Sequence, residues 1–162
     1  MSDLLSAWAV DRDSPLRPDV VALLEQHLQD MRVESPPESV HALDPAALDV
    51  PGTAFWTART GDGTLLGCAA LKGLSPGHAE LKSMRTAAAA RGRGVGSGLL
   101  DHVLAHAAAS GHRRVSLETG TQPFFLPARS LYLSRGFVDC GPFDDYVLDP
   151  WSVFMTRAVD DG

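Results

Sequence analysis

A run of glycines is the part of the sequence best suited to bind a ligand. In residues 91–98, which read Arg-Gly-Arg-Gly-Val-Gly-Ser-Gly, glycine occupies every second position. Glycine lets a backbone approach a ligand closely and adopt positive φ without strain. Residues 99–109 come directly after the run and have the pattern of a helix. The first amides of a helix lack internal partners and carry the positive end of its dipole, so the sequence predicts a phosphate or pyrophosphate site here.

Two common phosphate-binding patterns do not fit this run. A Walker loop needs Gly-Lys-Ser/Thr, and no lysine follows any of these glycines. The dinucleotide pattern Gly-x-Gly-x-x-Gly fails because its third glycine would fall on Ser97 or Leu99. What remains is Arg-x-x-Gly-x-Gly, carried by Arg91, Gly94 and Gly96. The competing interpretation is a plain flexible loop, which the position between a strand and a helix disfavours.

The surrounding elements are expected to place this run in a mixed sheet. Three strands in a row, with the hairpin dipeptide Asp62-Gly63 between the first two, indicate antiparallel pairing. The strand, glycine run, helix and strand over 79–119 form a crossover of the length that joins parallel strands. Expected strands are 6–10, 53–59, 64–74, 79–86, 113–119, 137–140 and 152–159; expected helices begin near 18, 38, 99 and 128, and 44–52 is expected to be a loop. The sum is an α+β (α/β) fold with about seven strands and three to four helices.

Composition and charge narrow the class of protein. A chain of 162 residues suits one domain, 1–162, with its own core. The net charge of −6 argues against a nucleic-acid partner. Two cysteines do not make a disulfide framework. We find no signal peptide and no apolar run of membrane-spanning length, so the expected location is the cytoplasm, with no membrane partner.

Three segments of the chain resemble the GNAT superfamily of acetyl-CoA-dependent N-acetyltransferases. The run 91–96 is similar to its pyrophosphate pattern, Arg/Gln-x-x-Gly-x-Gly/Ala. The strand before it ends at Met84–Thr86, where the family's backbone faces the acyl thioester; Thr86 stands where valine is usual, and Ala88 where proline is usual. Residues 131–137, Leu-Tyr-Leu-Ser-Arg-Gly-Phe, match a family segment that contains a tyrosine. The resemblance implies a mostly antiparallel sheet with a central parallel pair splayed at the cofactor site.

A narrower resemblance concerns a bacterial subgroup of small GNAT proteins whose substrate is unassigned. It rests on segments 80–82, 117–120, 141–146 and 152–155. The superfamily also implies acetyl-CoA as a co-substrate, no metal, and assembly as a homodimer. The implied cofactor-binding residues are Met84, Arg85, Thr86, Arg91, Gly92, Arg93, Gly94, Val95, Gly96 and Ser97, mostly through their backbones.

Acetyl transfer to an amine has chemical requirements that select three further residues. An alkylammonium has a pKa of about 10.4 and must lose a proton before it can attack. The departing thiolate benefits from a proton donor. Tyr132 is the acid that the resemblance implies. Glu80 and Glu118, on the strands flanking the expected opening, are alternative bases, with Glu80 slightly preferred; solvated surface glutamates are the competing interpretation.

Other polar and aromatic residues give weaker signals. His102 and His106 have the spacing of a metal pair on a helix but lack a third ligand, so a solvated helix face is expected. Aromatic residues that could line an acceptor pocket, or pack in the core, are Trp56, Phe124, Phe125 and Trp151. Asp144, Asp145 and Asp149 could attract an amine or lie in a solvated loop.

The leading functional prediction is therefore an acyltransferase. It moves an acetyl group from acetyl-CoA to a primary amine, on a small molecule or a peptide, by direct attack in a ternary complex. The alternatives are a non-catalytic module that binds or senses CoA on the same scaffold, and a plain nucleotide-binding protein.

Overall fold

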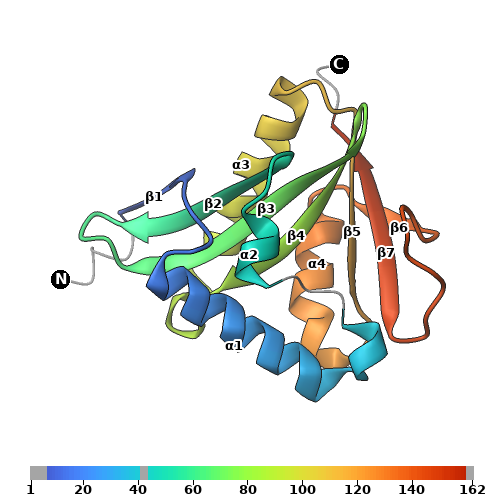
Figure 1. The fold of residues 1–162 in the computed structure, drawn as a ribbon, viewed down its shortest axis with the longest axis horizontal. Helices are drawn as coiled ribbons and strands as arrows, with labels where there is room; N and C mark the ends of the chain where they lie inside the picture. Colours follow the sequence, from blue (N-terminus) through green and yellow to red (C-terminus); the bar gives the residue numbers. More distant parts are fainter. Residues whose placement is uncertain (1–6, 41–43, 160–162) are drawn as a thin grey trace.

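The computed structural model describes residues 7–40 and 44–159 and contains one seven-stranded sheet. The strand order is β1-β2-β3-β4-β5-β7-β6 (Figure 1). The strands are β1 Trp8–Arg12, β2 Thr53–Thr60, β3 Leu65–Ser75, β4 His78–Thr86, β5 Arg114–Gly120, β6 Val138–Cys140 and β7 Ser152–Ala158. The α-helices are α1 Pro18–Glu34, α2 Pro45–Leu48, α3 Val95–Ala109 and α4 Leu126–Ser134. Short 3₁₀ turns are η2 Pro37–Ser39, η3 Ala88–Ala90 and η4 Pro123–Phe125.

The parallel pair β4–β5 is the point at which the sheet opens. All other neighbours in the sheet are antiparallel, as the sequence predicted. Strands β4 and β5 pair over only three positions, the last joining Glu80 to Ser116. Beyond it β4 contains a bulge, where Ser83 has a φ of +52°. A bulge bends its strand and re-aims the side chains around it. The expected splay of the central pair is thus confirmed.

Helices cover both faces of the sheet and fix the position of this opening. Helices α1 and α2 lie on one face and α3 on the other (Figure 1). The larger core cluster joins β2–β5 to α3 and α4 and includes Leu99, Leu100 and Val103, none of them exposed. A smaller cluster packs α1 and α2 against β2 and β3. Because both faces are packed, the ends of β4 and β5 and the start of α3 are held on a rigid frame.

Three local expectations differ from the structure. Segment 45–48, expected to be a loop, forms α2 because Asp44 accepts a bond from the Ala47 amide at 2.9 Å and Leu48 is buried. Helix α3 begins at Val95 rather than 99, since the buried Val95 side chain anchors its first turn. The short helix expected from residue 38 is only the 3₁₀ turn Pro37–Ser39, and residues 41–43 of that expectation lie outside the described residues.

Across residues 7–40 and 44–159, no helix is both long and apolar enough to cross a bilayer.

Candidate active site

The glycine run forms an exposed turn that ends at the first residue of α3. Gly94 is the N-cap of the helix, with φ +80° and ψ 8°, and no side chain caps it. A residue with a Cβ atom adopts this left-handed conformation at a cost, which explains the glycine. Among the described residues, none accepts a hydrogen bond from the amides of 92–97. These amides therefore remain available to an anion at the positive end of the helix dipole.

The helix start lies against the end of β4. A Cβ atom built on Gly96 would lie 3.6 Å from Thr86 Oγ1 and 3.7 Å from the Met84 side chain. It would also lie 3.4 Å from Leu131 of α4. The structure thus brings together the segments 84–86 and 91–97 that the sequence assigned to the cofactor. Arg91 and Arg93 are exposed beside the turn, so either guanidinium can reach a bound anion.

The side chain of Arg85 does not face the predicted cofactor site. It is buried, and its guanidinium donates to Asp30 of α1 at 2.5 Å. The contact with this guanidinium lowers the pKa of Asp30. The Arg85 side chain therefore ties α1 to β4, so the predicted cofactor role of Arg85 would rest on its backbone alone.

A cavity of about 90 Å³ lies where β4 and β5 separate. Helices α1 and α4 and the β6–β7 loop, residues 141–151, close its sides. Polar residues lining the cavity are His27, Glu80, Lys82, Ser83, Glu118, Thr119, Tyr132 and Tyr146. The apolar ones include Met31, Met84, Leu117 and Phe125. All three predicted catalytic residues therefore line one cavity, together with Met84 at the end of β4.

Tyr132 lies in α4 with its ring packed beside Phe137, at a centroid distance of 5.8 Å. Burial, and secondarily the nearby charge of Glu118, raises the pKa of Tyr132 to about 12. The phenol is therefore neutral near pH 7 and can donate a proton. Within the described residues its hydroxyl makes no hydrogen bond, so this proton is not already committed.

Glu118 is half-buried on β5, where Ser152 Oγ donates to its Oε2 at 2.8 Å. Burial raises the pKa of Glu118 to about 7. The Ser152 bond and the charge of Lys82 oppose this rise, while the carboxylates of Glu80 and Asp149 add to it. A carboxylate with a pKa near 7 is well matched to general-base work at neutral pH.

Glu80 has a different environment from Glu118. Its side chain is buried on β4, and its Oε2 accepts bonds from Tyr146 Oη at 2.5 Å and Lys82 Nζ at 3.2 Å. Lys82 Nζ also donates to Tyr146 Oη at 3.1 Å, which closes a triangle of three side chains. Glu80 is thus part of a buried ion pair that holds the β6–β7 loop against β4.

The sequence interpretation did not assign roles to four residues that line this cavity. Lys82 lies two positions after Glu80, and the two-residue period of a strand would have placed both side chains on one face. Tyr146 was noted only as part of a resemblance. His27 lies in α1, and its Nδ1 is buried without a partner among the described residues; burial lowers its pKa to about 4. Ser83 gave no signal, because a bulge has no simple sequence pattern.

The aromatic and histidine candidates fall in different places. Trp56 is a core residue and does not line the cavity. Its ring makes edge-to-face contacts with His102 and His106, so these histidines do not lie on a wholly solvated helix face. Phe125 lines the cavity, whereas Phe124 and Trp151 are exposed. Within 7–40 and 44–159, no three His, Cys, Asp or Glu side chains gather in a way that could hold a metal.

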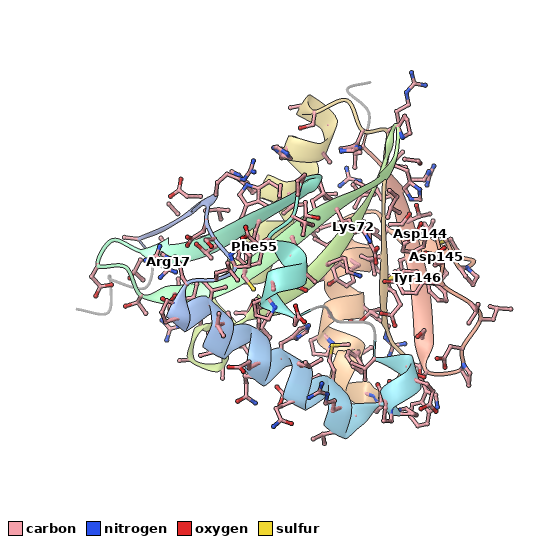
Figure 2. The ribbon with its side chains drawn as sticks, viewed as in Figure 1. Arg17, Phe55, Lys72, Asp144, Asp145 and Tyr146 are labelled. Atoms are coloured by element: carbon pink, nitrogen blue, oxygen red, sulfur yellow. The ribbon has the colours of Figure 1, made fainter. Side chains whose placement is uncertain are left out.

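The three acidic residues of the β6–β7 loop lie in two different environments. Asp144 and Asp145 line a second hollow of about 200 Å³ with Lys72, and this hollow shares Glu80, Lys82 and Tyr146 with the cavity. Figure 2 shows Lys72 on the same side of the sheet as the three loop residues. Asp149 instead accepts a bond from Ser39 Oγ at 2.5 Å and fixes the loop to the segment after α1.

The fold and the cavity together define an α+β domain whose sheet opens beside a glycine-rich helix start. The model of the acetyltransferase (GNAT) family matches residues 20–137, more than half of the chain. The chain therefore belongs to the GNAT family and is an acyltransferase.

Individual relatives agree with this assignment. An uncharacterised N-acetyltransferase of Bacillus subtilis, YsnE, is 50% identical over 140 residues, covering 86% of this chain and 92% of its own. An uncharacterised N-acetyltransferase of Escherichia coli, YedL, is 46% identical over 152 residues. The match covers 94% of this chain and 95% of YedL. The structure of spermidine N-acetyltransferase from Vibrio cholerae, solved with CoA and spermine, has a TM-score of 0.69 at 15% identity and covers 95% and 96% of the two chains. At that identity the structural likeness supports the fold alone.

Proposed function

We propose that this protein transfers an acetyl group from acetyl-CoA to a primary amine, by direct attack in a ternary complex. The observation that carries the proposal is that uncapped amides at the start of α3 adjoin a cavity containing a neutral phenol and a carboxylate with a pKa near 7. The presence of CoA in the Vibrio cholerae neighbour supports the choice of carrier.

The cofactor part of the proposal uses the backbone. The amides of 92–97 hold the pyrophosphate, and Arg91 or Arg93 adds positive charge. The backbone of Met84, Arg85 and Thr86 holds the pantetheine arm, with the acyl carbonyl near Met84. The unpaired amides fit a pyrophosphate because each of its oxygens accepts hydrogen bonds.

The catalytic part of the proposal uses two side chains of the cavity. Glu118 accepts a proton from the acceptor ammonium, which makes its lone pair available for attack on the acyl carbon. Tyr132 donates a proton to the departing thiolate. Glu80 neutralises Lys82 and positions Tyr146, so we assign it a supporting role and prefer Glu118 as the base.

The variant Tyr132→Phe tests whether Tyr132 is the general acid that protonates the departing thiolate. We expect kcat to fall about 10²-fold or more, at the lower end of general acid–base effects, because the thiolate loses its proton donor. The KM for acetyl-CoA should change little, since the ring and its packing on Phe137 remain. Steady-state kinetics with release of free thiol as the signal would measure both. A variant with full kcat would remove Tyr132 from the mechanism.

The whole proposal is tested by assaying thiol release across a panel of primary amines, alongside direct measurement of CoA binding. Binding of CoA without turnover of any amine would favour the alternative, a non-catalytic module that binds CoA. Failure to bind CoA would reject both the enzyme and the non-catalytic module.

Four further expectations remain predictions: a single domain over 1–162, a cytoplasmic location, a homodimer and the absence of a resident metal.

A further inference from the structure

Lysine is almost absent from this chain. Of its 14 basic side chains only two, Lys72 and Lys82, are lysines, and the rest are arginines. A guanidinium stays protonated and is a poor nucleophile, whereas a lysine amine can be acetylated. Lys82 lines both of the adjoining hollows at the opening of the sheet, and Lys72 lines the second of them. Every side-chain amine in the protein therefore lies near the proposed site of acetyl transfer.

Lys82 has the surroundings that an acceptor amine would need: a buried position in the cavity, close to carboxylates. Its side chain is only 8% exposed and lines the cavity with Met84, Glu118 and Tyr132. Its Nζ lies 3.2 Å from Glu80 Oε2, and its charge also acts on Glu118. Two carboxylates that can accept a proton thus flank an amine of the protein itself.

We propose that Lys82 is a self-acetylation site: without an acceptor, its amine takes the acetyl group from bound acetyl-CoA. The inference rests on the proposed function, because it needs the same donor. The geometry that carries it is that Lys82 lines the same cavity as Glu118, Tyr132 and Met84, on the strand that leads to Met84. Lys82 and Met84 lie on either side of the bulge at Ser83 and line the same cavity.

The step balances with groups already in the cavity. A carboxylate, of Glu80 or Glu118, takes a proton from the Lys82 ammonium, and the freed lone pair attacks the acyl carbon. The C–N bond forms and the C–S bond breaks. The departing thiolate takes a proton from Tyr132, which regains one from the nitrogen of the new amide. The products are acetyl-lysine, CoA thiol and one proton released to water.

Self-acetylation should switch the enzyme off. Acetyl-Lys82 carries no charge, so the Lys82–Glu80 ion pair disappears and a buried carboxylate loses its counter-charge. The acetyl group also occupies part of a cavity of only about 90 Å³. An acceptor amine that occupies the cavity first would block the modification and keep the enzyme active.

The experiment is incubation of the folded protein with acetyl-CoA alone, followed by mass spectrometry. Cleavage at arginine releases residues 60–85, which contain both lysines in one peptide. Lys72 is an internal control because it lies outside the cavity, whereas Lys82 is held in a buried ion pair with Glu80. Simple chemical acetylation would modify Lys72 first. We expect Lys82 to be acetylated about 10-fold faster, because it is positioned beside the bound donor.

Two variants and an added amine test whether the modification is specific to Lys82 and uses the enzyme's own site. Lys82→Arg keeps a cation for Glu80 but should abolish the modification, whereas Lys72→Arg should leave it unchanged. An amine that the enzyme turns over should slow acetylation of Lys82. Equal labelling of both lysines, or the same ratio in urea-unfolded protein, would overturn the proposal. Thiol release with an external amine but no label on Lys82 would reject self-acetylation while leaving the proposed function intact.

Discussion

Replacing Glu118 by glutamine should lower kcat/KM about 10²- to 10⁴-fold at pH 8, the range by which a general base accelerates proton transfer. Glutamine keeps the shape of the side chain and can still accept a bond from Ser152. It cannot take a proton from the ammonium of the acceptor. The assay is thiol release with a saturating donor and a limiting amine.

The pH dependence provides a second signature of the same residue. Because burial raises the pKa of Glu118 to about 7, the carboxylate is protonated below that pH and ionised above it. Only the ionised form is a base, so wild-type kcat/KM should rise with pH through about 7. Glu118→Gln should lack this step. The rates of the two proteins should converge as the pH falls, since protonated Glu118 is equally unable to accept a proton.

Glu80→Gln is the matched control. It removes a buried carboxylate and weakens the triangle with Lys82 and Tyr146, so activity should fall through misplacement of the β6–β7 loop. The pH step should remain and move to lower pH, because the negative charge of Glu80 raises the pKa of Glu118. If the step vanishes in Glu80→Gln and persists in Glu118→Gln, then Glu80 is the base.

The fold could be predicted well from the sequence because its signals are local. The helical stripe of α1, the turn between β2 and β3 and the glycine run each report their own geometry. The parallel pair followed from chain order, since a crossover helix must join parallel strands. Segment 45–48 was missed because a four-residue helix depends on one capping aspartate and one buried leucine, both of which need tertiary context.

The site could be predicted only in part, for a physical reason. The segments 84–86 and 91–97 are close in sequence, and their meeting follows from a strand that leads into a helix. The contact between Glu80 and Tyr146 spans 66 residues and depends on how the β6–β7 loop folds back. The difference between Glu80 and Glu118 arises from burial and from charges on other strands. A single sequence contains no direct signal for such effects.

Replacing Gly94 by valine should weaken CoA binding about 100-fold. The residue has a φ of +80°, so a β-branched side chain should twist the turn and misdirect the amides of 92–97. The loss of one hydrogen bond to a charged phosphate, worth about 1.5–3 kcal/mol, accounts for a change of this size. Isothermal titration with CoA, and the rise in Tm that CoA produces, would measure it.

Gly111→Val is the matched control, because Gly111 lies at the other end of α3 with a φ of +88°. A Cβ atom at either glycine has no heavy atom within 4 Å, so neither variant suffers a packing clash. Both should lose similar stability through backbone strain, about 1–2 kcal/mol. Since only Gly94 adjoins the free amides, only Gly94→Val should lose CoA affinity. Equal affinities in the two variants would mean that the start of α3 does not hold the pyrophosphate, and the proposed acetyl transfer would lose its carrier site.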